Sequence, residues 1–120
     1  MEAACRGAKE AGGVTVSIIP GEQFEDANSF SDIVIPSGIG FARNMTNVLS
    51  GHAVVVVGGG SGTLSELAYA WHFGKPILAL AWVEGVSATF AGKMLDKRRK
   101  HAIIAVKDLQ QLEHELSKLL

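Results

Sequence analysis

A cluster of four glycines joins an apolar run to a helical pattern, and this junction constrains the fold more than any other stretch of the chain. Residues 54–57 are four consecutive valines, and a run without polar alternation is typical of a strand covered on both faces of a parallel sheet. Residues 63–73 carry apolar side chains at helical spacing. The glycines between them lack Cβ atoms, so the backbone can turn sharply and lie against a ligand; they are Gly58, Gly59, Gly60 and Gly62. The stretch predicts a strand, a tight turn and the start of a helix.

Two interpretations of this turn follow from the residues. Unpaired N–H groups and the positive end of the helix dipole meet at a helix N-terminus and favour a bound anion, usually a phosphate. The turn could equally be a plain connection, in which Thr63 and Glu66 form a capping box that satisfies the helix-end amides. The pattern is neither the dinucleotide fingerprint nor a P-loop, since no Lys follows the last glycine. NAD binding of the fingerprint type and Walker-type ATP hydrolysis are therefore disfavoured.

Composition narrows the class of protein. A chain of 120 residues with 48% hydrophobic residues and 14 glycines predicts one compact α/β domain over residues 1–120. The net charge of −1 argues against a nucleic-acid partner, and the absence of a leader or a long apolar run argues against secretion and a membrane partner. Cys5 is the only cysteine, and the four histidines lack ligand spacing, so we expect no disulfide, no metal site and a cytoplasmic location.

Strand and helix patterns alternate along the chain. We expect strands at 14–19, 32–35, 54–57, 77–80 and 102–106, and helices at 1–11, 37–49, 63–73, 90–99 and from 109 onward, the last with Asp108 as its cap and Gln111 in the reciprocal position. Residues 82–89 read as a loop, and the basic run 97–101 as a solvated helix end. This order predicts a three-layer, Rossmann-like α/β fold with a mainly parallel sheet of about five strands. Arg43 and Asn44 would then lie near the carboxyl edge of the sheet, where ligands bind in such folds.

Residues 58–66, Gly-Gly-Gly-Ser-Gly-Thr-Leu-Ser-Glu, resemble the P-G-G-x-G-T-x-x-E motif of the LOG-like, or lysine-decarboxylase-like, Rossmann superfamily. The chain looks most like the nucleotide-binding branch that includes the molybdenum cofactor carriers. Residues 1–13, 19–21, 35–38, 42–44 and 74–76 extend the resemblance over essentially the whole chain. The resemblance favours anion binding at the turn over a plain connection.

The resemblance implies two functions. The first is a binding protein for a phosphorylated nucleotide-like or molybdopterin-type ligand that needs no other cofactor, with the phosphate held by residues 58–63 (Gly58, Gly59, Gly60, Ser61, Gly62 and Thr63) and with Arg43 and Asn44 as further contacts. The alternative is a LOG-like phosphoribohydrolase, which would cleave the N-glycosidic bond of a nucleoside 5′-monophosphate with Glu66 and Arg43 as catalytic residues. Gly58 stands where the enzymes have Pro, and this departure favours binding.

In the family, two strands, a helix and a glycine-rich turn normally precede this first helix. None of these elements precedes it in the given sequence. The resemblance therefore implies an N-terminally truncated domain, in which residues 14–19 and 54–57 are no longer joined by a central strand and strand edges are exposed. We expect compensation by a homodimer or higher homo-oligomer, by a rearranged sheet, or by membership of a longer product.

Overall fold

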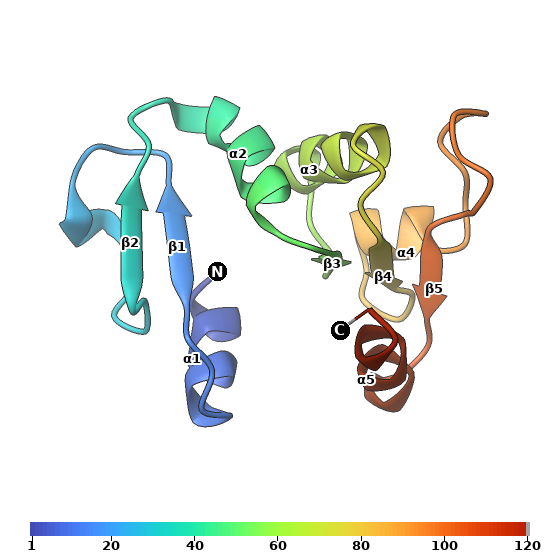
Figure 1. Ribbon diagram of the computed structural model, residues 1–120, viewed down its shortest axis with the longest axis horizontal. Coiled ribbons are helices and arrows are strands. Elements are labelled where there is room, and N and C mark those ends of the chain that lie inside the picture. Colours follow the sequence, from blue (N-terminus) through green and yellow to red (C-terminus); the bar gives the residue numbers. More distant parts are fainter. Residues whose placement is uncertain (120) are drawn as a thin grey trace. The chain divides into compact units, whose positions relative to one another are not determined.

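The computed structural model describes residues 1–119. The chain divides into two compact units, Met1–Arg43 and Asn44–Leu120. We call them unit 1 and unit 2 and describe each by itself. Five strands are present, as expected, but the single five-stranded sheet was wrong: the strands form one sheet of two and one of three (Figure 1). The reason lies in the pairing, because no described strand pairs with both β1 and β3.

Unit 1 contains a two-stranded parallel sheet and one α-helix. Its elements are α1 (Glu2–Glu10), β1 (Val16–Ile19), the 3-10 turn η1 (Phe24–Asp26), β2 (Ile33–Pro36) and the 3-10 turn η2 (Gly40–Ala42). β1 and β2 pair in register, Val16 opposite Ile33 and Ile18 opposite Ile35. The helix α1 approaches β1 where Cys5 Sγ lies 3.8 Å from Ser17 Oγ. Unit 1 thus places two strands side by side with a helix against one of them.

Unit 2 contains a three-stranded parallel sheet in the order β3-β4-β5. Its elements are α2 (Arg43–Ser50, which begins at the last residue of unit 1), β3 (Val54–Val56), α3 (Ser61–His72), β4 (Ile77–Leu80), α4 (Val86–Phe90), β5 (Ile104–Val106) and α5 (Leu109–Ser117). The central strand β4 is buried along its whole length, as its four apolar residues predict.

Two apolar clusters cover the two faces of this sheet. Ile77 and Ala79 pack with Val48 of α2, with Leu67 and Trp71 of α3 and with residues of α4. On the opposite face, Leu78 and Leu80 pack with Val106 and with Leu112 and Leu116 of α5. Alternate side chains of one strand point to opposite faces, so β4 joins the two clusters into a helix–sheet–helix arrangement within unit 2. Helices therefore cover both faces of the sheet of unit 2.

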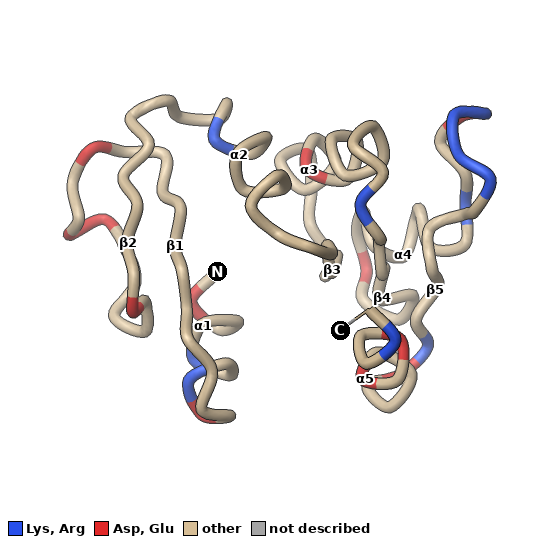
Figure 2. Tube along the Cα trace, in the orientation of Figure 1, with Lys and Arg blue, Asp and Glu red and all other residues tan. Residues whose placement is uncertain are grey.

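The predicted helix at 90–99 was wrong, because α4 lies earlier, at Val86–Phe90. The N–H of Gly92 donates to the Ile103 carbonyl, and the N–H of Ile103 donates to the Lys93 carbonyl. These bonds to a segment ten residues away engage backbone groups that a helix continuing from Phe90 would have paired locally. The basic run is consequently a loop between α4 and β5 (Figure 2), in which the Arg99 guanidinium lies 4.8 Å from the centre of the Trp71 ring.

Candidate anion-binding turn

The glycine turn lies where the sequence predicts it, between the end of β3 and the start of α3. Parallel strands direct their carboxyl ends to one edge of the sheet, which is the edge where ligands bind in open α/β folds. Gly59 and Gly60 are exposed at this edge, whereas Gly58 is buried. The turn is thus both anchored in the protein and open to solvent.

Glycine is required at two places that touch each other. Gly59 has φ +89°, and a Cβ there would lie 2.1 Å from Thr63 Oγ1. Gly85, which precedes α4, has φ +120°, and a Cβ on it would lie 2.7 Å from the Gly59 carbonyl oxygen. Both φ values lie in the region that L residues avoid. The turn keeps its shape because two backbone segments pack closely where neither carries a side chain.

The start of α4 braces the turn through Ser87, whose side chain is fully buried. Ser87 Oγ accepts the Gly58 N–H at 2.8 Å, and the N–H groups of Val86 and Ser87 donate to the carbonyls of Gly59 and Gly58 at 3.0 and 3.1 Å. The Gly58 amide is therefore engaged inside the protein. Sequence reasoning missed this brace, since nothing local relates Ser87 to a turn 29 residues earlier.

Five consecutive amides beyond Gly58 remain without a partner. Within residues 1–119, no backbone or side-chain acceptor lies on the N–H groups of Gly59, Gly60, Ser61, Gly62 or Thr63. The last three belong to the first turn of α3, whose N–H groups have no partner inside the helix. The N-cap Gly60 supplies no side-chain bond. The positive dipole end of a twelve-residue helix thus coincides with five consecutive N–H groups that lack an acceptor within residues 1–119.

The capping box interpretation of this turn was wrong. The helix begins at Ser61, two residues before Thr63, so Thr63 is not in the cap position. Glu66 instead accepts a hydrogen bond from the Asn47 side chain at 2.9 Å through Oε1. The reason is that glycine at position 60 can itself take the non-helical conformation of the cap.

Asn44 lies 5% exposed beneath the first turn of α3. Its Nδ2 donates to Ser65 Oγ at 2.9 Å, and that hydroxyl donates to the Gly62 carbonyl at 2.6 Å. In the structure, Asn44 thus holds the helix start in place. Its direct contact with a ligand stays a prediction.

Arg43 belongs to unit 1, and its guanidinium is bound there. Nη1 donates to the Ile18 carbonyl at 2.7 Å and lies 3.7 Å from Met1 Sδ. The structure thus gives Arg43 a structural contact at the end of β1. Its role toward a ligand remains a prediction.

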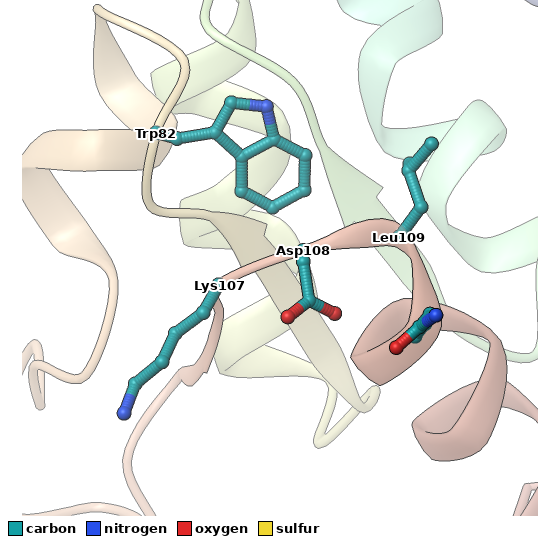
Figure 3. A pocket seen from close by; sticks show the side chains of 5 residues that line it. Trp82, Lys107, Asp108 and Leu109 are labelled. Carbon is teal, nitrogen blue, oxygen red and sulfur yellow. The ribbon is translucent and has the colours of Figure 1, made fainter.

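A pocket opens beyond the carboxyl ends of β4 and β5 (Figure 3). Its volume is about 490 Å³, and it is lined by Trp82, Lys107, Asp108, Leu109 and Gln110. Trp82 follows β4, and the other four residues surround the start of α5, where Asp108 caps the helix by accepting the Gln111 N–H at 2.8 Å. The Asp108 cap was predicted; the pocket was not, because its lining comes from two segments 25 residues apart.

Over residues 1–119, no group of three or more His, Cys, Asp or Glu side chains is arranged to hold a metal ion. None of the described helices has the length and apolar character needed to cross a bilayer.

Comparison with known families gives a match over most of the chain. The model of the SLOG cluster4 family matches residues 1–113. An uncharacterised protein of Archaeoglobus fulgidus is 45% identical over 80 residues, which are 67% of this chain and 52% of that protein. The chain therefore spans about half the length of the curated relative that it matches.

Solved structures share the fold. The X-ray structure of TM1055 superimposes with a TM-score of 0.89 at 28% identity, covering 98% of this chain and 71% of that one. The molybdenum cofactor binding protein of the phototrophic bacterium Rippkaea orientalis gives 0.84 at 31% identity, covering 99% and 70%. The molybdenum cofactor carrier protein of Chlamydomonas reinhardtii gives 0.79 at 32% identity, covering 97% and 68%. The Rossmann-like, parallel α/β class expected from the sequence is confirmed by these neighbours.

Proposed function

This chain belongs to the SLOG cluster4 family, and we propose that it binds a phosphorylated ligand of nucleotide or molybdopterin type and does not transform it. The phosphate is held by the amides of residues 59–63. The five N–H groups for which residues 1–119 supply no acceptor carry this proposal. Backbone N–H groups at a helix N-terminus are suited to a phosphate, because they donate several hydrogen bonds to one anion along the helix dipole.

Two further observations support the proposal. The turn is held in shape before any ligand arrives, through Ser87 and through the contact of Gly59 with Gly85. A preformed site loses less conformational entropy on binding. Two similar structures are named for binding or carrying the molybdenum cofactor, whose pterin part bears a phosphate.

Residue Gly60 allows a direct test. A Cβ at this position meets open space, so the fold can accommodate both Gly60→Asp and Gly60→Ala without a steric clash. Aspartate is a favoured N-cap, and its carboxylate would accept the first-turn amides while repelling a phosphate. We expect Gly60→Asp to weaken the binding of inorganic pyrophosphate and ribose 5-phosphate at least ~10-fold, because charge-assisted hydrogen bonds contribute about 1.5–3 kcal/mol each.

Gly60→Ala is the matched control, since it adds the Cβ without the charge. Its affinity should stay within about threefold of the original chain, and Gly60→Asp should be about 1 kcal/mol more stable than Gly60→Ala because of the cap. Calorimetric titration and thermal unfolding of the same samples measure both. If the unsubstituted chain binds neither probe, or if Gly60→Asp binds as well as Gly60→Ala, the proposal is wrong.

The same titrations separate binding from hydrolysis. One carboxylate oxygen of Glu66 accepts from Asn47, and no observation assigns this residue a reacting partner. Guanosine 5′-monophosphate should therefore be recovered intact after incubation. If free guanine is released, and if Glu66→Gln abolishes this release, the protein is an N-glycosidic hydrolase and the proposal that it only binds its ligand is wrong.

A further inference from the structure

Trp82 lies in an unusual position for a large aromatic side chain. It comes two residues after β4, whose four residues are all buried, yet it is itself 48% exposed. Lys107 directly follows β5, the neighbour of β4 in the parallel sheet. Trp82 and the start of α5 therefore stand at the same carboxyl edge of one sheet, which is also the edge of the glycine turn.

Two of the five residues that line the pocket of about 490 Å³ are apolar, Trp82 and Leu109. Figure 3 shows the side chains of Trp82 and Leu109 on one side of the segment that joins β5 to α5, while those of Lys107 and Asp108 extend to the other side. Leu109 is 69% exposed. A planar ring between an indole and an isobutyl group would cover apolar surface on both, and such burial is favourable.

Comparison with the other tryptophan shows that Trp82 lacks the polar and stacking contacts that fix Trp71. Trp71 is 2% exposed, its indole N–H donates to Asp96 Oδ1 at 2.8 Å, and the Arg99 guanidinium covers its ring. Over residues 1–119, the Trp82 indole N–H has no acceptor and no cation or aromatic ring stacks on its face. Trp71 thus completes the core, whereas the surface of Trp82 is open to a ligand.

The loop that carries Trp82 also touches the glycine turn. A Cβ on Gly58 would lie 3.0 Å from the Glu84 carbonyl oxygen and 3.2 Å from Val83 Cγ1. The residues directly after Trp82 therefore pack on the backbone directly before the unpartnered amides. This contact places the indole on the segment adjacent to the candidate phosphate site.

We propose that the pocket binds the planar nitrogen heterocycle of the ligand, a purine or a pterin, between the Trp82 indole and the Leu109 side chain. This inference rests on the function proposed above, since it assigns the ring of the same ligand whose phosphate the glycine turn holds. Gln110 also lines the pocket, and its carboxamide has both a donor and an acceptor for the polar edge of such a ring. Trp82 is then the residue that distinguishes a nucleotide or pterin phosphate from a simple sugar phosphate.

The test compares two probes that share the ribose 5-phosphate group, one with a purine at C1′ and one with a hydroxyl there. For the unsubstituted chain, guanosine 5′-monophosphate should bind at least ~10-fold more tightly than ribose 5-phosphate, in line with the effect of aromatic stacking on a base. Trp82→Ala should remove this difference and leave the affinity for ribose 5-phosphate unchanged. Trp82→Phe, which keeps an aromatic face, should keep most of it. Phe24→Ala, a truncation of an aromatic residue 65% exposed in unit 1, is the matched control and should change neither affinity.

Fluorescence reports the contact itself. Stacking on Trp82 should quench its emission, while Trp71 gives a constant background, so Trp82→Phe should remove the quenching. A second titration with 6-hydroxymethylpterin phosphate distinguishes a purine from a pterin. If either guanosine 5′-monophosphate or the pterin phosphate binds more tightly than ribose 5-phosphate, the result supports a ring site.

The outcomes separate the two proposals. If neither guanosine 5′-monophosphate nor ribose 5-phosphate binds, the phosphate site is wrong and the ring site with it. If both phosphates bind equally to the unsubstituted chain, or if Trp82→Ala leaves their ratio unchanged, the ring site is wrong while the glycine turn stands. Gly60→Asp should weaken both probes equally, which no change at Trp82 should do.

Discussion

The two units are stabilised in different ways. Unit 2 has apolar clusters on both faces of its sheet, and all four residues of β4 are buried. Among the described residues, unit 1 has only two buried apolar side chains, Ile18 and Ile19. Both units contain parallel strands next to helices, so secondary structure alone does not tell them apart. The difference lies in how much apolar surface each removes from water.

Polar contacts replace the missing core in unit 1. Thr15 is 6% exposed, and its hydroxyl donates to the Phe30 carbonyl at 2.6 Å. Its backbone N–H donates to Asp32 Oδ2 at 2.8 Å, and the other oxygen of that carboxylate pairs with Lys9 of α1. The apolar residues Val16, Ile33 and Ile35 meanwhile stay 45–53% exposed. Hydrophobic burial has little pH dependence, whereas a network around a carboxylate does, so the units should respond to different perturbations.

The largest effect should come from truncating the core of unit 2. Leu67 of α3 is 0% exposed and packs with the cluster around Trp71 and Ile77. Leu67→Ala should lower the free energy of unfolding by about 3–5 kcal/mol, through lost burial and the cavity left behind. Denaturant unfolding followed by circular dichroism measures this loss. Leu64→Ala in the same helix, where Leu64 is 39% exposed, should cost less than about 1 kcal/mol; equal losses would contradict the core assignment.

Removing one buried hydroxyl in unit 2 should have the next largest effect. Ser87→Ala would leave the Gly58 N–H without its acceptor, and an unsatisfied buried donor costs about 1–3 kcal/mol. The loss should be accompanied by weaker binding of pyrophosphate, since the turn loses its brace. Thr89→Ala is the control in the same helix. Ser87 Oγ donates to the Val83 carbonyl at 2.9 Å, and the exposed Thr89 hydroxyl likewise donates to the Gly85 carbonyl at 2.9 Å, but it accepts no buried N–H within residues 1–119. If Thr89→Ala costs as much as Ser87→Ala, the turn does not depend on this brace.

The parts of unit 2 that sequence predicts well are those fixed by contiguous residues. Residues 77–80 were expected as a strand and form β4. A short run of four apolar residues is typical of a strand that is buried on both faces, and all four residues are buried. The Asp108 cap was confirmed, since Asp108 and Gln111 are one helical turn apart. The Gln111 side chain does reach back, although to the Lys107 N–H and not to that of Asp108.

The predictions that failed depended on contacts between distant segments. The pairing of Gly92 with Ile103 displaced the helix expected at 90–99, and no local pattern reports such a bond. The five strands were found, yet their division into sheets of two and three depends on which edges meet. The candidate site divides in the same way: the unpartnered amides of the glycine turn follow from its own residues, whereas Ser87, which braces the turn, and Trp82, which we propose as a ring contact, come from elsewhere in the chain.

The smallest effect should be confined to unit 1 and to acidic pH. The Lys9 ammonium, the Thr15 N–H and the Thr15 hydroxyl all stabilise the charged form of Asp32, and they lower the pKa of its carboxyl to about 2 from the usual 3.8. A carboxyl whose pKa is lower in the folded chain stabilises the fold above its unfolded pKa. That contribution is lost as the pH falls from about 4 through 2. The contribution is modest because the Lys9 pair is exposed and screened by salt.

Hydrogen exchange can detect this effect in one unit at a time. Protection of the β1 amides, corrected for the intrinsic exchange rate, should fall between pH 4 and pH 2, while that of β4 should not follow the same curve. In Asp32→Asn, the protection of the β1 amides should no longer depend on pH in this range, because the amide cannot ionise. It should stay at the lower value that the unsubstituted chain shows at pH 2. Asp96 provides the control in unit 2, since the Trp71 indole N–H and the Arg98 backbone N–H lower the pKa of its carboxyl. Asp96→Asn should leave the β1 profile unchanged; loss of the β1 dependence in that variant would mean that the two units do not respond separately to acid.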